Sequence, residues 1–253
     1  MPNGAETVTQ TIDVPSANGA IDCHLSRPAG EGKWPGVLMM TDVHGTRPAF
    51  EVMARRLASL GYVVLLPNVY YRGGHAPLWD LSLPRDNPEV EGVRARMRAT
   101  LTPDAIVPDM GAGLDYLAGL GQVGGAKMGV VGYCMSGSFA LRAAAAFPDK
   151  VAAAASFHGG RLVTEDADSP HLTIPNVRGE LYFAHADQDN SMTTAMIDRL
   201  EKALDAAGRT FHSELYTGAR HGFAVSDVPA YDPKACGRHW LALTELLGRT
   251  LAA

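Results

Sequence analysis

The sequence predicts an α/β fold in which a mostly parallel central sheet carries helices on both faces. Three short apolar runs, at 36–41, 62–67 and 127–133, have the composition of strands that are buried on both faces. Segments with helical periodicity separate such runs along most of the 253 residues. This alternation of strand and helix is the pattern of a parallel sheet with crossover helices.

Strands at 7–14 and 20–27 open the chain. The turn-rich link Ser-Ala-Asn-Gly at 16–19 joins them, which predicts an antiparallel hairpin. The buried strand at 36–41 and a helix at 48–60 come next, and the strand of the second apolar run follows them.

Residues 68–102 interrupt the alternation with aromatics, prolines, glycines and arginines that show no clear period. We expect a loop with short helices here, where binding surfaces are often built. The later elements are expected as a helix at 104–120, a strand at 127–133, a helix at 136–147, a strand at 151–157, an irregular stretch at 159–178, a strand at 180–186, a helix at 193–207, a strand at 210–216 and a helix at 232–251. With no linker or repeat in sight, residues 1–253 are expected to form a single domain.

Charge and composition exclude several classes of protein. The formal net charge of −5 argues against a strongly basic nucleic-acid binder. Residues 1–20 have neither the basic start nor the apolar stretch of a signal peptide, and no run has the length of a membrane span. We therefore expect a cytoplasmic protein without membrane or nucleic-acid partners, as a monomer or small homo-oligomer. The cysteines lack the spacing of a metal site or a disulfide framework.

Cys134 stands in a tight turn between a strand and a helix, in Gly-Tyr-Cys-Met-Ser-Gly at 132–137. A nucleophile in such a turn has a strained backbone and needs small neighbours, here Gly132 and Ser136, although glycine is usual where Ser136 stands. The helix N-terminus favours a thiolate, and the Met135 N–H is expected to face an oxyanion beside the sulfur. The turn therefore predicts a cysteine nucleophile.

Other interpretations of this segment exist. Cys134 could be a small buried side chain, which is how we interpret Cys23 and Cys236. Ser136 or Ser138 could be the nucleophile, but both lie inside the expected helix, past the turn. The strand–turn–helix setting favours Cys134.

Such a turn is typical of the α/β-hydrolase fold, in which the acid and then the histidine follow the nucleophile along the chain. The strand at 180–186 leads into Asp187 and Asp189. Asp189 lies further into the loop and matches the usual offset, Asp187 is the alternative, and either could be a turn or capping aspartate. His221 precedes a glycine in the expected loop after the strand at 210–216, where the base belongs.

The other histidines give no metal site by their spacing. His44, His158, His171 and His185 lack the His-Glu-x-x-His arrangement, so we expect no metal and no cofactor. Three of these, His44, His158 and His185, lie near the ends of predicted strands, where they are candidates to line a pocket.

These motifs together resemble the dienelactone hydrolase family over nearly the whole chain. The resemblance rests on Gly-Tyr-Cys-Met-Ser-Gly at 132–137, Ala-Asp-Gln-Asp at 186–189, His-Gly-Phe at 221–223, Gly-Tyr-Val-Val at 61–64, Pro-Ala-Tyr-Asp at 229–232 and Arg-His-Trp at 238–240. It implies a triad of Cys134, Asp189 and His221 that cleaves a lactone or ester through a thioester. It also implies that the backbone N–H of Val43 is the second oxyanion donor.

This chain departs from the pattern of the family at two positions. Family members have a glutamate, thought to take the thiol proton, where this chain has the shorter Asp42. They bind a substrate carboxylate with two arginines; Arg72 matches the first, but Val225 stands at the second. Losing one such contact can cost about 1.5–3 kcal/mol. Further expected contacts to a carboxylate-bearing lactone or ester are Tyr71, His44 and Phe223. Candidate replacements for the missing arginine are Arg220, Arg161 and His44, and a different lactone or ester is the alternative.

Two rival functions remain at this point. A broad carboxylesterase or thioesterase would use the same residues on other substrates. A non-catalytic binding protein would have no need of a nucleophile, an acid and a base in the required chain order.

Overall fold

Strands and helices alternate along residues 5–251, which the computed structural model describes. The strands are β1 (Thr7–Ser16), β2 (Gly19–Pro28), β3 (Trp34–Met40), β4 (Val63–Pro67), β5 (Val123–Tyr133), β6 (Val151–Phe157), β7 (Glu180–Gln188) and β8 (Phe211–Arg220). The helices are α1 (Pro48–Ser59), α2 (Pro88–Arg98), α3 (Pro103–Gly119), α4 (Ser136–Ala146), α5 (Thr194–Ala206) and α6 (Pro233–Thr250), with short 3-10 helices η1 (Tyr71–Gly73) and η2 (Pro170–Asn176).

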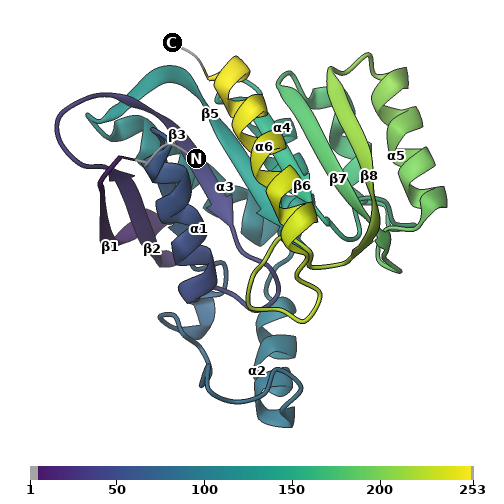
Figure 1. Cartoon of the computed structure of the whole chain (residues 1–253), viewed down its shortest axis with the longest axis horizontal. Helices are drawn as coiled ribbons and strands as arrows, with labels where there is room; N and C mark the ends of the chain where they lie inside the picture. The colour runs from purple at the N-terminus through teal and green to yellow at the C-terminus, as the bar shows by residue number, and fades with distance from the viewer. Residues whose placement is uncertain (1–4, 252–253) are drawn as a thin grey trace.

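All eight strands form one sheet, in the order β1-β2-β4-β3-β5-β6-β7-β8 (Figure 1). The expected hairpin is present, with β1 antiparallel to β2, and β2 is antiparallel to β4. Every other pair of neighbours is parallel. The predicted fold class is therefore confirmed.

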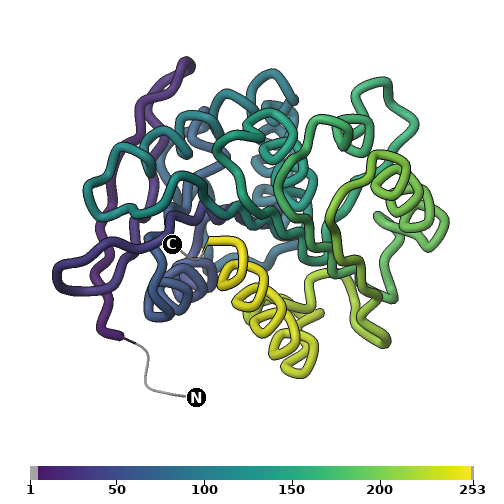
Figure 2. Tube along the Cα trace, turned by 90° about the horizontal axis from the view of Figure 1, so that it is seen from above, coloured from purple at the N-terminus to yellow at the C-terminus, as the bar shows by residue number. Residues whose placement is uncertain are grey.

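Helices cover both faces of the sheet (Figure 2). α1 and α6 pack on one face, whereas α3, α4 and α5 pack on the other. Successive residues of a buried strand reach opposite faces, so Leu38 of β3 joins one core cluster and Met39 joins the other. This double burial explains the continuous apolar runs of the central strands. No helix within residues 5–251 has the length and apolar character needed to cross a bilayer.

β7 and β8 extend further than predicted. Their register shifts between Ala186 and Gln188, after which Gln188 pairs with Arg220. A strand that continues past such an irregularity loses the alternation of buried and exposed residues, so the sequence pattern did not predict the extension. The prediction of a loop between strand and base was therefore wrong, because His221 follows β8 directly.

The interruption at 68–102 holds η1 and α2, as the sequence predicted. α2 begins after Asn87, whose side chain accepts a hydrogen bond from the Glu89 N–H at 2.9 Å. In Figure 1, α2 lies beyond the edge of the sheet at which β3 and β6 end. It thereby stands over the side on which α/β sheets bind ligands.

Candidate active site

Cys134 occupies the turn between β5 and α4 with a left-handed backbone, at φ 56°. Its N–H donates to the Phe157 carbonyl at 3.1 Å, and its carbonyl accepts from the Gly160 N–H at 3.1 Å. A Cβ on Gly132 would lie 1.9 Å from the Ser136 carbonyl oxygen, so only glycine fits there. The strained turn predicted from the sequence is present.

Ser136, which stands where glycine is usual, is fully buried. Its hydroxyl accepts from the Tyr133 N–H at 2.8 Å, and its one proton has two acceptors in reach, the Tyr133 carbonyl at 3.0 Å and the Met40 carbonyl of β3 at 3.1 Å. The hydroxyl thus ties the turn to β3 and is absent from the lining of the cavity that Cys134 faces. These contacts explain why a serine can stand at the position where glycine is usual.

His221 joins the thiol to a carboxylate. Its Nε2 lies 3.0 Å from Cys134 Sγ and its Nδ1 lies 2.6 Å from Asp189 Oδ2. Asp189 Oδ1 accepts from the N–H of Ser191 at 2.8 Å and from its hydroxyl at 2.6 Å. Asp187 instead accepts from the Gly218 N–H at 2.8 Å. Of the two carboxylates, the structure brings Asp189 to the histidine.

Burial and hydrogen bonding have opposite effects on the pKa values of His221 and Asp189. Burial lowers the pKa of His221, but its hydrogen bonds to Asp189 and Cys134 outweigh burial and raise this pKa to about 10. Burial raises the pKa of Asp189, but His221 and Ser191 hold it below its usual range. The geometry therefore favours an imidazolium between a carboxylate and the sulfur.

A second histidine packs behind the first. The ring of His158 is fully buried, with its centroid 5.3 Å from that of His221 and 5.0 Å from that of Phe223. Burial holds the pKa of His158 well below its usual value and lowers that of His185 to about 4, so both rings are neutral. Within residues 5–251, no group of three or more potential ligands is arranged to hold a metal ion.

The two residues expected to donate to an oxyanion lie at the same cavity as the thiol. Val43, which follows β3, and Met135 both line the cavity with Cys134. The Tyr70 hydroxyl donates to the Val43 carbonyl at 3.1 Å and lies 3.5 Å from the Met135 sulfur. Tyr70 therefore holds the loop after β3 against the nucleophile turn.

Asp42 is held by an arginine and not by the thiol. Its two carboxylate oxygens accept from Arg47 at 2.7 and 2.9 Å, and Oδ1 also accepts from the His44 N–H at 2.8 Å. It is not among the residues that line the cavity. The geometry does not support the expected role as a proton acceptor, because both oxygens already have cationic partners.

The expected substrate contacts also lie elsewhere. Arg72 pairs with Asp109 at 2.8 Å, and the Tyr71 hydroxyl donates to the same carboxylate at 2.8 Å. His44 Nδ1 lies 3.2 Å from Arg94, and Phe223 is completely buried in the core. None of Arg72, Tyr71, His44 and Phe223 lines the cavity of Cys134. These roles came from motif position alone, which does not give the direction of a side chain.

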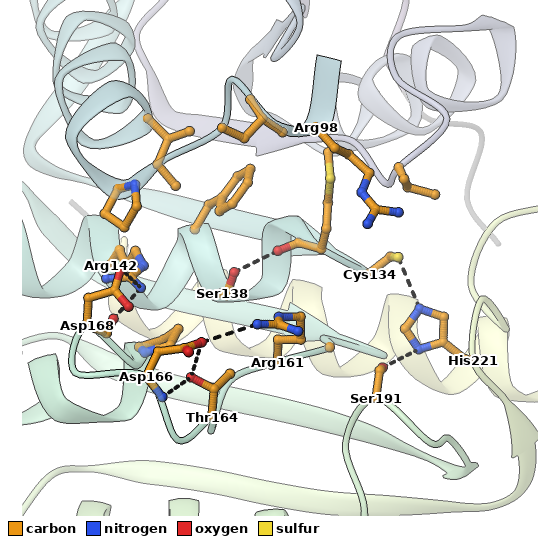
Figure 3. Close-up of a pocket in the computed structure, with 18 residues that line it drawn as sticks. Arg98, Cys134, Ser138, Arg142, Arg161, Thr164, Asp166, Asp168, Ser191 and His221 are labelled. Carbon is orange, nitrogen blue, oxygen red and sulfur yellow. Dashed lines mark hydrogen bonds and ion pairs between the residues drawn. The ribbon is translucent and has the colours of Figure 1, made fainter. Parts of the chain in front are cut away.

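The cavity has a volume of about 490 Å³ and contains arginines that the sequence reasoning missed (Figure 3). Arg98 comes from the end of α2 and Arg142 from α4, beside Arg161, which had been considered as a replacement. Arg142 could have been predicted, because it follows Ser138 by four residues and Met135 by seven. This spacing places it on the helix face that continues from the nucleophile turn. No comparable signal existed for Arg98.

Comparisons with known proteins show what this chain resembles. The model of the dienelactone hydrolase family matches residues 21–251. A carboxymethylenebutenolidase from Rhodococcus opacus is 26% identical over 99% of this chain and 94% of its own. A protein from Methylorubrum extorquens, assigned as a carboxymethylenebutenolidase, is 27% identical over 92% of this chain and 78% of its own. A Klebsiella pneumoniae crystal structure, assigned as a dienelactone hydrolase, shares the fold with a TM-score of 0.85 at 19% identity, covering 96% of this chain and 99% of its own.

Proposed function

This chain belongs to the dienelactone hydrolase family, with the α/β-hydrolase fold, and we propose that it hydrolyses a carboxylate-bearing lactone or ester through a thioester on Cys134. The family makes it a hydrolase of small-molecule esters or lactones. The observation that supports the mechanism is the continuous relay from Cys134 Sγ through His221 to Asp189, with spacings of 3.0 and 2.6 Å.

Acylation begins from the ion pair in which Nε2 of His221 already holds the proton of Cys134, and the thiolate attacks the carbonyl carbon. As the carbon–sulfur bond forms, the carbonyl oxygen becomes negative, and the N–H groups of Val43 and Met135 stabilise it. Collapse of this adduct breaks the carbon–oxygen bond to the leaving group, and His221 returns the proton to the leaving oxygen. In a lactone, that oxygen stays attached to the acyl group.

Deacylation uses the same residues in reverse. His221 takes a proton from water, and the resulting hydroxide attacks the thioester carbon. The carbon–sulfur bond breaks, the acid leaves, and the Cys134 thiolate is restored beside the imidazolium. Asp189 keeps the ring of His221 in its orientation through both steps.

An arginine without an ion-pair partner in the cavity supports the proposal that the substrate carries a carboxylate. Among the described residues, Arg142 and Arg161 have aspartate partners, at 3.9 and 3.3 Å, whereas Arg98 has no ion-pair partner. Figure 3 shows Arg98 reaching toward the part of the cavity that holds Cys134. Arg98 thus takes the role that the sequence had given to Arg72, because an unpaired guanidinium can bind a carboxylate in two-point fashion.

Replacing Cys134 by alanine tests the proposal. Hydrolysis of p-nitrophenyl acetate by Cys134→Ala should fall by at least about 10³-fold in kcat/KM. Mass spectrometry of quenched wild-type enzyme should find one acyl group, absent from the variant. The matched control, Cys236→Ala, removes a buried thiol that does not line the cavity and should keep activity. Full turnover by Cys134→Ala would exclude the mechanism.

A broad carboxylesterase or thioesterase is the second candidate. The complete burial of Val225 in the core favours it, because no second carboxylate-binding group is available from that position. Comparable kcat/KM for neutral aryl esters, thioesters and a dienelactone would select this function. A non-catalytic binding protein would instead bind lactones without product release.

A further inference from the structure

The cavity continues well beyond the reacting thiol. Met135, Ser138, Phe139 and Arg142 all line it, and their spacing places them on one face of α4. With a rise of 1.5 Å per residue, this face runs about 12 Å from Cys134 to Arg142. Figure 3 shows Arg142 and Asp168 at the end opposite Cys134 and His221. The cavity is thus a trough along α4.

The middle of the trough is apolar. Leu101, Pro103 and Ile106, which lead into and begin α3, line it together with Phe139. Ile106 and Phe139 are both largely buried. This stretch suits a hydrocarbon chain or ring and offers it no hydrogen-bonding partner of its own.

The far end carries balanced charges. The Arg142 side chain is 12% exposed, donates to the Asp168 carbonyl and has the Asp168 carboxylate at 3.9 Å. Burial lowers the pKa of Arg142, and Asp168 offsets this only in part. Arg161 and Asp166 form a second pair at 3.3 Å along the same wall. The end therefore presents donors and acceptors without net charge.

We propose that Arg142 and Asp168 form a second binding subsite, which takes the uncharged hydrogen-bonding terminus of an elongated ester, such as a primary amide. An amide carbonyl would accept from the Arg142 guanidinium, and its NH₂ would donate to Asp168. An anion would meet the two aspartates and a cation the two arginines, so either is disfavoured. This inference rests on the proposed function for the identity of the reacting end.

Calorimetry on the wild-type protein tests the subsite without turnover. The probes are straight-chain acids, about eight to ten atoms long to span the trough, which end in a methyl group, a primary amide, a carboxylate or an ammonium. The amide should bind about tenfold tighter than the methyl-terminated acid, a difference of about 1.4 kcal/mol. Arg142→Met should remove this advantage. Arg178→Met, which breaks a surface pair with Asp149, should retain it.

Asp168→Ala gives a second readout if Arg142→Met does not fold. Removing this exposed carboxylate leaves the far end with an excess positive charge, so the preference should move from the amide to the dicarboxylate. An equal affinity of wild type for all four termini, or a dicarboxylate that binds best to wild type, would overturn the subsite. If Cys134→Ala kept esterase activity while the amide preference held, the mechanism would fail and the subsite would stand.

Discussion

The guanidinium of Arg47 holds both carboxylate oxygens of Asp42 in the interior, where the two residues are 3% and 4% exposed. On its other side Arg47 binds Asp227, at 2.7 and 3.0 Å. Asp42 directly precedes Val43, one of the two proposed oxyanion donors. The ion pair therefore braces the loop from which that N–H group comes.

The substitution Asp42→Asn distinguishes two roles for Asp42, which are to brace the loop before Val43 and to accept the thiol proton. We expect it to lower the free energy of unfolding by about 3 kcal/mol, because it leaves a buried guanidinium with one carboxylate fewer. The rate at which iodoacetamide alkylates Cys134 should change less than about threefold, since His221 remains at the thiol. Urea unfolding and timed alkylation measure the two effects, with the exposed Asp80→Asn as control. A collapse of alkylation would restore Asp42 as the proton acceptor.

The choice of acid is testable with two neighbouring substitutions. Asp189→Asn should lower kcat roughly 10³- to 10⁴-fold, because the amide no longer stabilises the imidazolium. Asp187→Asn should change kcat only a few-fold, since Asp187 binds the backbone N–H of Gly218 within β8 and not the histidine. Steady-state kinetics with p-nitrophenyl acetate compares them. The reverse order of effects would reassign the acid.

The pKa of His221 leads to a pH dependence of stability. In the folded wild-type protein burial lowers this pKa, but Asp189 and Cys134 outweigh burial and raise it from the usual value of about 6.5 to about 10. The stabilisation is then complete below about pH 6.5 and is lost as pH rises through the elevated folded-state pKa. Urea unfolding from pH 6 to pH 10 should show this loss, and Asp189→Asn, which removes one of the two partners that raise the pKa, should reduce it. A contribution that grew with pH would contradict the assignment.

Ser136→Ala tests the serine that replaces glycine in the nucleophile turn. The change leaves the buried Tyr133 N–H and Met40 carbonyl without this partner, so we expect a loss of about 1–3 kcal/mol in unfolding free energy. Ser138→Ala, which removes one helical hydroxyl contact to Met135, should cost less. Equal losses would show that the hydroxyl of Ser136 does not tie the turn to β3.

Arg98→Gln should change substrate preference. An unpaired arginine that binds a substrate carboxylate contributes about 1.5–3 kcal/mol, so kcat/KM for a carboxylate-bearing ester should fall about 10- to 100-fold. Hydrolysis of a neutral ester of the same size should fall much less. Arg96→Gln, an exposed neighbour on α2 outside the cavity, is the control. Equal losses on both esters would exclude a charge-reading role.

The sequence predicted the site residues whose positions follow from the order of the strands along the chain. It did not predict the site residues in segments without a helical or strand period. Cys134, Asp189 and His221 each stand at the carboxyl end of a strand, and parallel strands bring such ends together. Arg72 and Arg98 both lie in the interrupted segment, whose lack of period gives no direction to any side chain. Only the structure shows that the first pairs with Asp109 and the second reaches the thiol's cavity.

β8 ends the sheet and has β7 as its one strand neighbour. His221 follows β8 directly, and its N–H returns to the Gln188 carbonyl of β7 at 3.4 Å. Strands at a sheet margin are the first to open locally, ahead of the core. Heating should therefore abolish activity while most of the helical signal persists, and amide hydrogen exchange should be faster along β8 than along the central strand β5. We therefore expect the enzyme to lose activity through fraying of this marginal strand before its core melts.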